Sequence, residues 1–184
     1  MYGLANKAIA DMFRSQFGEG TWQEIRQLAA VENDTFLSME GYADDVTHRL
    51  VKAGSQVFGL SSSQIMQVFG EFWVQFTATE GYGELIDMSG DNLPEFLGNL
   101  DNLHARVGIS FPQLKPPSFE SYEGATKNEL TLEYHSEREG LAPMILGLVK
   151  GLGDRFDTDI EIAQTQSRDD GAEHDEFTIK YKER

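Results

Sequence analysis

A single histidine, His104, lies on the apolar side of a helix that the sequence predicts over residues 92–107. It follows Leu100 by four residues and Leu97 by seven, which places it on the buried stripe. A lone imidazole there is either a core histidine bonded to a backbone carbonyl or a metal ligand. No acidic residue or second histidine shares the stripe. A metal at His104 would therefore be held by this side chain alone, as an axial histidine holds haem iron.

Three hydrogen-bond donors recur at every second position in a segment predicted to be a strand. Tyr134, Ser136 and Arg138 would point to the same side of that strand. The planar guanidinium of an arginine matches a carboxylate with two parallel hydrogen bonds. The trio therefore suits an anionic ligand that carries carboxylates. The alternative is the ordinary polar face of a half-exposed strand.

Two acidic clusters that contain a histidine are interpreted as solvated charge. Asp44, Asp45 and His48 lie within one helical turn, and His174 lies among Glu173, Asp175 and Glu176. Either group could hold a divalent cation, but real metal sites need buried support around their ligands.

Three glycines, Gly147, Gly151 and Gly153, resemble a phosphate-binding loop only superficially. No Gly-Lys-Ser/Thr follows them, and the segment is predicted to be helical. They are better interpreted as small residues that let a flat ligand or another helix approach. The sequence contains no organised catalytic set.

The composition restricts the classes of partner. The chain has 184 residues, with 31 acidic and 15 basic side chains and a formal net charge of −16. Such a charge disfavours binding to nucleic acid and to anionic membranes. Cysteine is absent, which excludes disulfides, thiolate metal sites and covalent attachment of a c-type haem.

No targeting or membrane-spanning segment is recognised. The N-terminus lacks the build of a signal peptide, and the longest nearly apolar run, residues 141–149, is far shorter than the roughly 20 residues that span a bilayer. The sequence therefore predicts a cytoplasmic protein.

Hydrophobic periodicity predicts helices in the first two-thirds of the chain and strands in the last third. Helices are expected over residues 4–17, 21–30, 44–58, 64–79 and 92–107, and from residue 82. Capping boxes are expected at Thr21 with Glu24 and at Ser61 with Gln64. Segment 64–79 is apolar on more than one face and is expected to be central.

The last third alternates with the period of a strand. Strands are predicted over residues 129–136, 159–166 and 176–182, with a short helix over 141–152 and a turn at 168–171. Prolines at 112, 116 and 117 favour extended structure before them. The fold class is α+β: an N-terminal helical subdomain packed on a C-terminal subdomain with an antiparallel sheet and helices.

Taken together, His104 and the later Tyr134-His135-Ser136-Glu137-Arg138 resemble the H-NOX family of haem nitric oxide/oxygen binding domains, which includes the haem domain of soluble guanylate cyclase. The resemblance covers essentially the whole chain. It includes segments 1–4, 81–85 and 100–104, and is greatest to stand-alone bacterial, particularly cyanobacterial, members. Some bacterial members carry a cysteine-ligated zinc, which this chain cannot have.

The resemblance implies a role for each motif residue. His104 would be the proximal ligand of a non-covalent b-type haem, and Tyr134, Ser136 and Arg138 would bind its propionates. Pro117 would press on the porphyrin and distort it. The haem would be buried between an N-terminal subdomain of about residues 1–60 and a haem-binding subdomain of residues 61–184.

The predicted distal wall favours nitric oxide over oxygen. Oxygen-binding members of the family place a distal tyrosine in the helix after the propionate strand, and residues 141–149 contain no side-chain donor. Met144, Leu148, Trp73 and Leu4 are the candidate wall residues; ordinary core packing is the alternative for Trp73 and Met144. The expected ligands are nitric oxide and carbon monoxide.

The predicted function is that of a gas sensor and not of an enzyme. Nitric oxide weakens the bond opposite it, so the resemblance implies that the His104–iron bond can break and release the helix, while carbon monoxide leaves it intact. The expected partner is a separate histidine kinase or diguanylate cyclase. One alternative is a haem enzyme such as a peroxidase or an oxygenase, although a peroxidase needs a distal acid–base pair that residues 141–149 lack. The other is a haem-free module that binds another carboxylate ligand or a partner.

Overall fold

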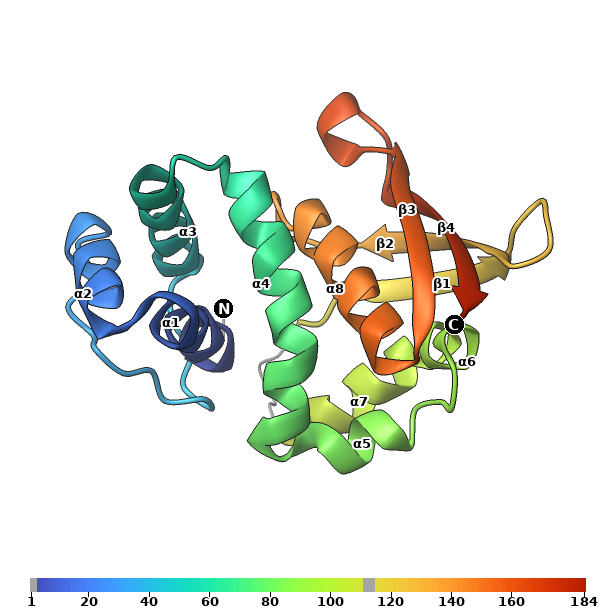
Figure 1. Ribbon diagram of the computed structural model, residues 1–184, viewed down its shortest axis with the longest axis horizontal. Helices are drawn as coiled ribbons and strands as arrows, with labels where there is room; N and C mark the ends of the chain where they lie inside the picture. The colour runs from blue at the N-terminus through green and yellow to red at the C-terminus, as the bar shows by residue number, and fades with distance from the viewer. Residues whose placement is uncertain (1–2, 111–114) are drawn as a thin grey trace.

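A computed structural model describes residues 3–110 and 115–184, with helices first and a sheet at the far end (Figure 1). The first three helices are α1 (Gly3–Phe17), α2 (Glu19–Leu28) and α3 (Asp44–Phe58). They pack around a core that includes Ile9, Phe13, Trp22, Ile25 and Leu50. The prediction of an α+β architecture is confirmed.

The central helix α4 (Ser62–Thr77) lies between these three helices and the rest of the molecule (Figure 1). It is followed by a π-helical turn η1 (Ala78–Tyr82) and by α5 (Gly83–Asp87). The predicted capping box is present: the Ser61 side chain accepts from the Gln64 N–H, and the Gln64 side chain accepts from the Ser61 N–H. The predicted central position of this apolar helix is confirmed.

The predicted capping box of the second helix is wrong. The helix α2 begins at Glu19, after Gly18 in a positive-φ conformation, and no side chain caps it. The Thr21 hydroxyl donates instead to the Phe17 carbonyl, 3.0 Å away. Because Gly18 turns the chain directly after α1, the next helix starts three residues earlier than a cap at Thr21 would place it.

The predicted single helix over residues 92–107 is two helices. Asn92 caps α6 (Leu93–Gly98), which ends at Asn99, and α7 runs over Leu100–Ser110. Asn99 leaves helical geometry, and its side chain donates to the Ser89 carbonyl at 3.0 Å. His104 therefore lies on α7 with Leu100, whereas Leu97, which was predicted to share its apolar stripe, lies on α6.

The sheet has four antiparallel strands in the order β1-β2-β4-β3. They are β1 (Ser118–Glu123), β2 (Glu129–His135), β3 (Thr158–Gln166) and β4 (Asp175–Glu183), with a 3-10 turn η2 (Arg168–Asp170) between the last two. The strand β1 was not predicted, because only Phe119 is buried along it. The helix α8 (Ala142–Arg155) packs between this sheet and α4 (Figure 1).

Glycines bring α4 and α8 into backbone contact. A Cβ atom at Gly147 would lie 1.9 Å from the Gln67 carbonyl oxygen, and one at Gly70 would lie 2.2 Å from the Met144 carbonyl oxygen. The prediction that small residues admit another helix is thus confirmed at Gly147. Within the described ranges, no helix is long and apolar enough to cross a membrane.

Candidate cofactor-binding cavity

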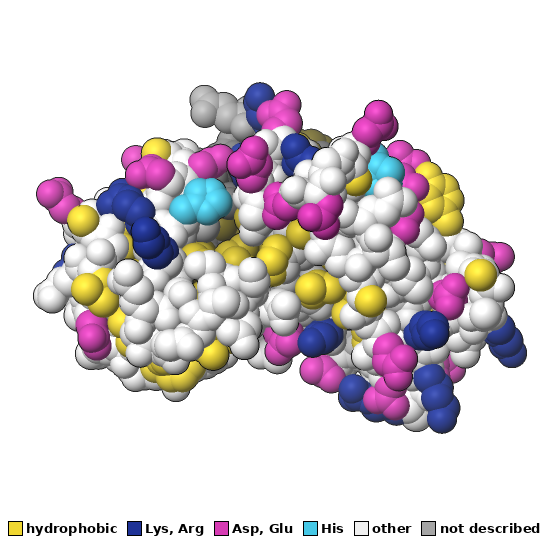
Figure 2. Space-filling view, turned by 90° about the horizontal axis from the view of Figure 1, so that it is seen from above, with side chains coloured by type: hydrophobic (Ala, Val, Ile, Leu, Met, Phe, Trp, Pro, Cys, Tyr) yellow, Lys and Arg dark blue, Asp and Glu magenta, His cyan; other side chains and the backbone are white. Residues whose placement is uncertain are grey.

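A cavity of about 260 Å³ lies where α1, α4, α7, α8 and the sheet meet. Figure 2 shows hydrophobic side chains along the junction between the two halves of one face, with acidic groups on both halves. The lining is mostly apolar, and Leu4, Ala5 and Thr47 enter it from the first 60 residues. The predicted division into two subdomains stays a prediction, but residues from both parts meet here.

His104 lines this cavity from α7. Its ring stacks on Phe119 of β1, with centroids 5.6 Å apart and an interplanar angle of 23°. The Nδ1 atom is buried and has no hydrogen-bond partner among the described residues. The alternative of a core histidine bonded to a backbone carbonyl through Nδ1 is therefore not supported.

The electrostatics keep His104 neutral. Burial lowers the pKa of the imidazole below its ordinary value, while nearby Asp101 opposes that shift in part. A neutral imidazole has a free lone pair, which is the form that binds metal ions. The side chain is thus in a state suited to axial ligation.

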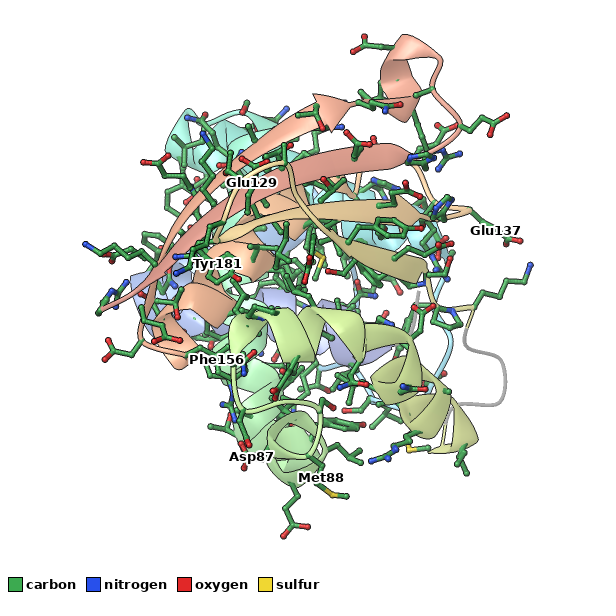
Figure 3. All side chains as sticks on the ribbon, turned by 90° about the vertical axis from the view of Figure 1, so that its right-hand side faces the viewer. Asp87, Met88, Glu129, Glu137, Phe156 and Tyr181 are labelled. Atoms are coloured by element: carbon green, nitrogen blue, oxygen red, sulfur yellow. The ribbon has the colours of Figure 1, made fainter. Side chains whose placement is uncertain are left out.

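The predicted donors Tyr134, Ser136 and Arg138 all line the same cavity. Only Tyr134 lies within β2, which ends at His135; Ser136 and Arg138 follow in the loop before α8. The interpretation that all three share one face of a strand is therefore wrong in detail. Figure 3 shows the intervening Glu137 pointing away from the sheet, and its carboxylate pairs with Lys115 at 3.0 Å.

The Tyr134 hydroxyl is held in its protonated form. The side chain is only 2% exposed, and burial raises its pKa, against the opposing effects of Ser136 and of nearby arginines. A buried phenol that stays protonated can donate a hydrogen bond to an anion.

The Arg138 guanidinium already contacts an oxygen on each side. Its Nε donates to Asp44 Oδ2 at 3.2 Å, and its Nη1 donates to the Lys115 carbonyl at 3.0 Å. The backbone N–H of Arg138 donates to Ser136 Oγ at 3.1 Å. Because an arginine side chain carries five N–H donors, an anion at this end of the cavity could be bound beside Asp44 or in its place.

The predicted wall residues Leu4, Trp73, Met144 and Leu148 line the cavity together. Trp73 packs edge-on against Phe69, with ring centroids 5.8 Å apart. Pro117 lines the cavity as well; Pro112 lies outside the described residues.

Four polar lining residues were missed by the sequence analysis: Thr47, Thr77, Tyr82 and Lys115. The Thr47 hydroxyl donates to Asn6 Oδ1 at 2.7 Å, and the Thr77 hydroxyl donates to the Trp73 carbonyl at 2.8 Å. Both hydroxyl protons are thus engaged within the protein. Tyr82 lies on η1, and burial raises its pKa. Its position after a helix break gave no periodic signal.

The two acidic clusters that contain a histidine differ in whether their members lie together in the structure. Asp44 contacts Arg138 and Asp45 contacts Arg49, so those two acids serve as ion-pair partners near His48. His174 does not group with its sequence neighbours. In the part of the chain that the structure describes, the one metal-like group is Glu133, His135 and His174.

Comparison with known proteins identifies the family. A family model for haem-NO-binding domains matches residues 2–164. The chain belongs to the haem-NO-binding family. This result confirms the resemblance on which the residue roles were predicted.

Relatives and solved structures agree with the assignment to the haem-NO-binding family. The soluble guanylate cyclase gcy-31 of Caenorhabditis elegans is 32% identical over 163 residues, which cover 88% of this chain and 23% of that protein. The guanylate cyclase soluble subunit beta-2 of Rattus norvegicus is 36% identical over 100 residues, 54% of this chain and 14% of that protein. The chain thus spans about a quarter or less of these relatives.

Solved structures share the fold of this haem-NO-binding domain. An H-NOX protein from S. oneidensis in the Fe(II)NO ligation state has a TM-score of 0.88 at 22% identity, with 99% of both chains covered. An unliganded Fe(II) H-NOX mutant from K. algicida has a TM-score of 0.82 at 22% identity, with 100% of this chain and 97% of that one covered. Domains of this family are haem-based gas sensors and not enzymes, as predicted for this chain.

The cavity fits the family's cofactor on its own geometry. A haem needs one neutral axial ligand, apolar surfaces for a flat ring and donors for two carboxylates. His104 with its unpartnered Nδ1, the largely apolar lining, and the Tyr134–Arg138 segment supply these at one cavity. The roles of the individual residues stay predictions.

Proposed function

We propose that this domain binds a non-covalent b-type haem through His104 and senses nitric oxide. The observation that carries the proposal is that His104, with its buried and unpartnered Nδ1 atom, and all three predicted carboxylate-binding residues line one apolar cavity. When bound, the haem supplies an iron with a coordination position for a small gas molecule. The absence of cysteine supports non-covalent attachment.

In this proposal His104 is both ligand and tether. Burial keeps its imidazole neutral, and stacking on Phe119 restricts the ring orientation. A bond at this ring fixes α7 relative to the rest of the cavity. Release of His104 would free α7, which is the two-state element that regulation requires.

Tyr134, Ser136 and Arg138 are proposed to hold the propionates. They line the cavity where Lys115 and Asp44 also contribute charge, so that two carboxylates would lie in the most polar part of the lining. Pro117, at the cavity surface, is proposed to press on the porphyrin. This arrangement separates the charged edge of the cofactor from the apolar wall.

The wall of Leu4, Trp73, Met144 and Leu148 is proposed to select against oxygen. Oxygen bound to haem gains from a distal hydrogen-bond donor, whereas nitric oxide depends on one much less. The hydroxyl protons of Thr47 and Thr77 are engaged elsewhere, so neither threonine offers a donor to a bound gas, and the Trp73 ring packs edge-on against Phe69. We therefore propose binding of nitric oxide and carbon monoxide without a stable oxygen complex.

The signal is proposed to reach a separate effector, a histidine kinase or a diguanylate cyclase. A partner can respond only if it binds the tethered and released forms with different affinity. Carbon monoxide, which leaves the tether in place, is expected to signal weakly or not at all.

The test is to load the purified protein with haem and record absorption spectra of the reduced form under nitric oxide, carbon monoxide and air. We expect spectra of gas complexes with the first two gases and no spectrum of a stable oxygen complex in air. His104→Ala should lose most of the haem, while His48→Ala, a change at an exposed histidine on α3, should retain it. Equal haem retention and an unchanged spectrum in His104→Ala would reject the ligand assignment.

A further inference from the structure

The strand β2 also presents a cluster of possible metal ligands on its other face. Side chains alternate along a strand, so Glu133 and His135 point away from the face that carries buried Tyr134. His174, which directly precedes β4, joins them there. We propose that Glu133, His135 and His174 form a second metal site, separate from the cavity, that binds a zinc ion.

The ligand atoms are placed at metal-site distances. Glu133 Oε2 lies 3.5 Å from His135 Nε2 and 3.8 Å from His174 Nε2. Two ligands of a tetrahedral zinc ion, each about 2.0–2.1 Å from the metal, lie about 3.3 Å apart. Both carboxylate–imidazole distances exceed this spacing by only a few tenths of an ångström, and all three ligand atoms lie within 4.8 Å of one another.

Both imidazoles present an unused nitrogen at this point. The Nε2 atoms of His135 and His174 are buried and lack a hydrogen-bond partner among the residues described. The rings lie close together, with centroids 4.7 Å apart and an interplanar angle of 39°. Buried polar atoms without a partner are rare in proteins, and a shared cation would satisfy both.

The surrounding charge favours a cation. In the sheet register Glu133 lies directly opposite Glu120 on β1 and opposite Glu176 on β4. Like charges opposite each other across strands are destabilising. Glu120 accepts from the Tyr122 hydroxyl and Glu176 from the Thr165 hydroxyl, so each of the outer acids has a donor of its own. A metal ion at Glu133 would offset the repulsion in the middle of the row.

The ligand chemistry selects zinc over calcium or magnesium. Two imidazole nitrogens and one carboxylate oxygen suit zinc, whereas calcium and magnesium prefer oxygen ligands alone. The three side chains are 38%, 20% and 24% exposed for His135, His174 and Glu133, so water can reach a fourth position. The ion would join β2 to the segment between η2 and β4. It would lie on the face of β2 opposite to the one that carries Tyr134.

The experiment is a calorimetric titration of Zn²⁺ into the haem-loaded protein, with elemental analysis of bound zinc. We expect one zinc ion per chain and a rise in the unfolding temperature, because the ion binds the folded form. His135→Ala and His174→Ala should each weaken binding by more than about 100-fold, since even changes around metal ligands lower affinity roughly 10–100-fold.

Two matched variants serve as controls. His48→Ala removes an exposed histidine elsewhere, and Glu120→Gln removes a charge from the same row without removing a ligand; both should retain one tight site. Glu133→Gln, which keeps the side-chain shape, should lose it. Unfolding temperatures without zinc show that each variant folds. If the purified protein holds no haem, His104 could itself bind added zinc. The same titration of the His104→Ala variant then measures binding at Glu133, His135 and His174 alone.

Two results would overturn the proposal. One is unchanged zinc affinity in the folded double variant His135→Ala/His174→Ala. The other is weak binding of several ions per chain that His48→Ala or Glu120→Gln reduces as much as the ligand variants do, which is the behaviour of a diffuse acidic surface.

Discussion

Two regions of the cavity are stabilised in opposite ways. The wall formed by α4 and α8 is held by backbone contact at Gly70 and Gly147, and the hydroxyl of nearby Thr77 donates within its own helix. The region around Arg138 is held by exchangeable polar contacts with Asp44 and the Lys115 carbonyl. Neither glycine of the first region can take a larger side chain without a clash, whereas in the second region one anion can replace another at Arg138.

This difference assigns separate tasks to the two regions. A wall in which the Thr77 hydroxyl is engaged and residues 141–149 offer no side-chain donor can select against oxygen, which gains from a distal donor. A polar region whose contacts are partly exposed can bind the carboxylates of a ligand at modest free-energy cost.

The largest effect on stability is expected in the wall. Gly147→Ala would place a Cβ atom 1.9 Å from the Gln67 carbonyl oxygen, so α4 and α8 must separate. We expect a loss of about 3 kcal/mol in the free energy of unfolding, as overpacked cores show, measured by urea denaturation. Gly20→Ala, in α2 with no atom within 4 Å of the new Cβ, should be neutral or slightly stabilising. Equal effects would contradict the backbone-contact interpretation.

The next effect is expected in haem affinity at the polar region. Arg138→Ala removes charge-assisted hydrogen bonds, each of about 1.5–3 kcal/mol, so haem affinity should fall roughly 10- to 100-fold. Tyr134→Phe should cost less, since it removes one neutral donor. The rate of haem transfer to an excess of apomyoglobin measures both. The propionate assignment fails if Arg138→Ala and the wild type release haem at the same rate.

A smaller effect of opposite sign is expected at Asp44. Asp44→Asn weakens the contact that competes for the Arg138 guanidinium. Because such part-exposed ion pairs contribute under about 1 kcal/mol, haem affinity should rise only a few-fold. Asp45→Asn, at the neighbouring residue that pairs with Arg49, should have no effect in the same transfer assay. A decrease in affinity for Asp44→Asn would show that Asp44 positions Arg138 rather than competing for it.

The smallest effect is expected at Tyr82. If its hydroxyl does not reach a bound gas, Tyr82→Phe should leave the spectra under nitric oxide, carbon monoxide and air unchanged. Met144→Tyr, by contrast, adds a donor to the wall and should create some oxygen affinity. Loss of an oxygen complex on changing Tyr82 would reverse the proposed selectivity of the wall.

Much of the fold was predictable because its signals are local. The Ser61–Gln64 capping box, the start of a helix at residue 92 and the alternation in β2 are all patterns among near neighbours, and each is present. The strand β1 escaped prediction because pairing with β2, rather than its own alternation, holds it in the sheet. The break at Asn99 escaped because the apolar periodicity runs through it, while the Asn99 side chain bonds to the carbonyl of Ser89, ten residues earlier.

The sequence by itself determined that one histidine lies among apolar neighbours, that three donors follow it, and that no cysteine is present. Only the tertiary structure decided that Arg138 contacts Asp44, 94 residues away, and that His174 meets His135 rather than its acidic neighbours. The physical reason is range. Helix period and capping depend on residues a few positions apart, whereas such contacts depend on how helices pack and how strands register, which no local pattern specifies.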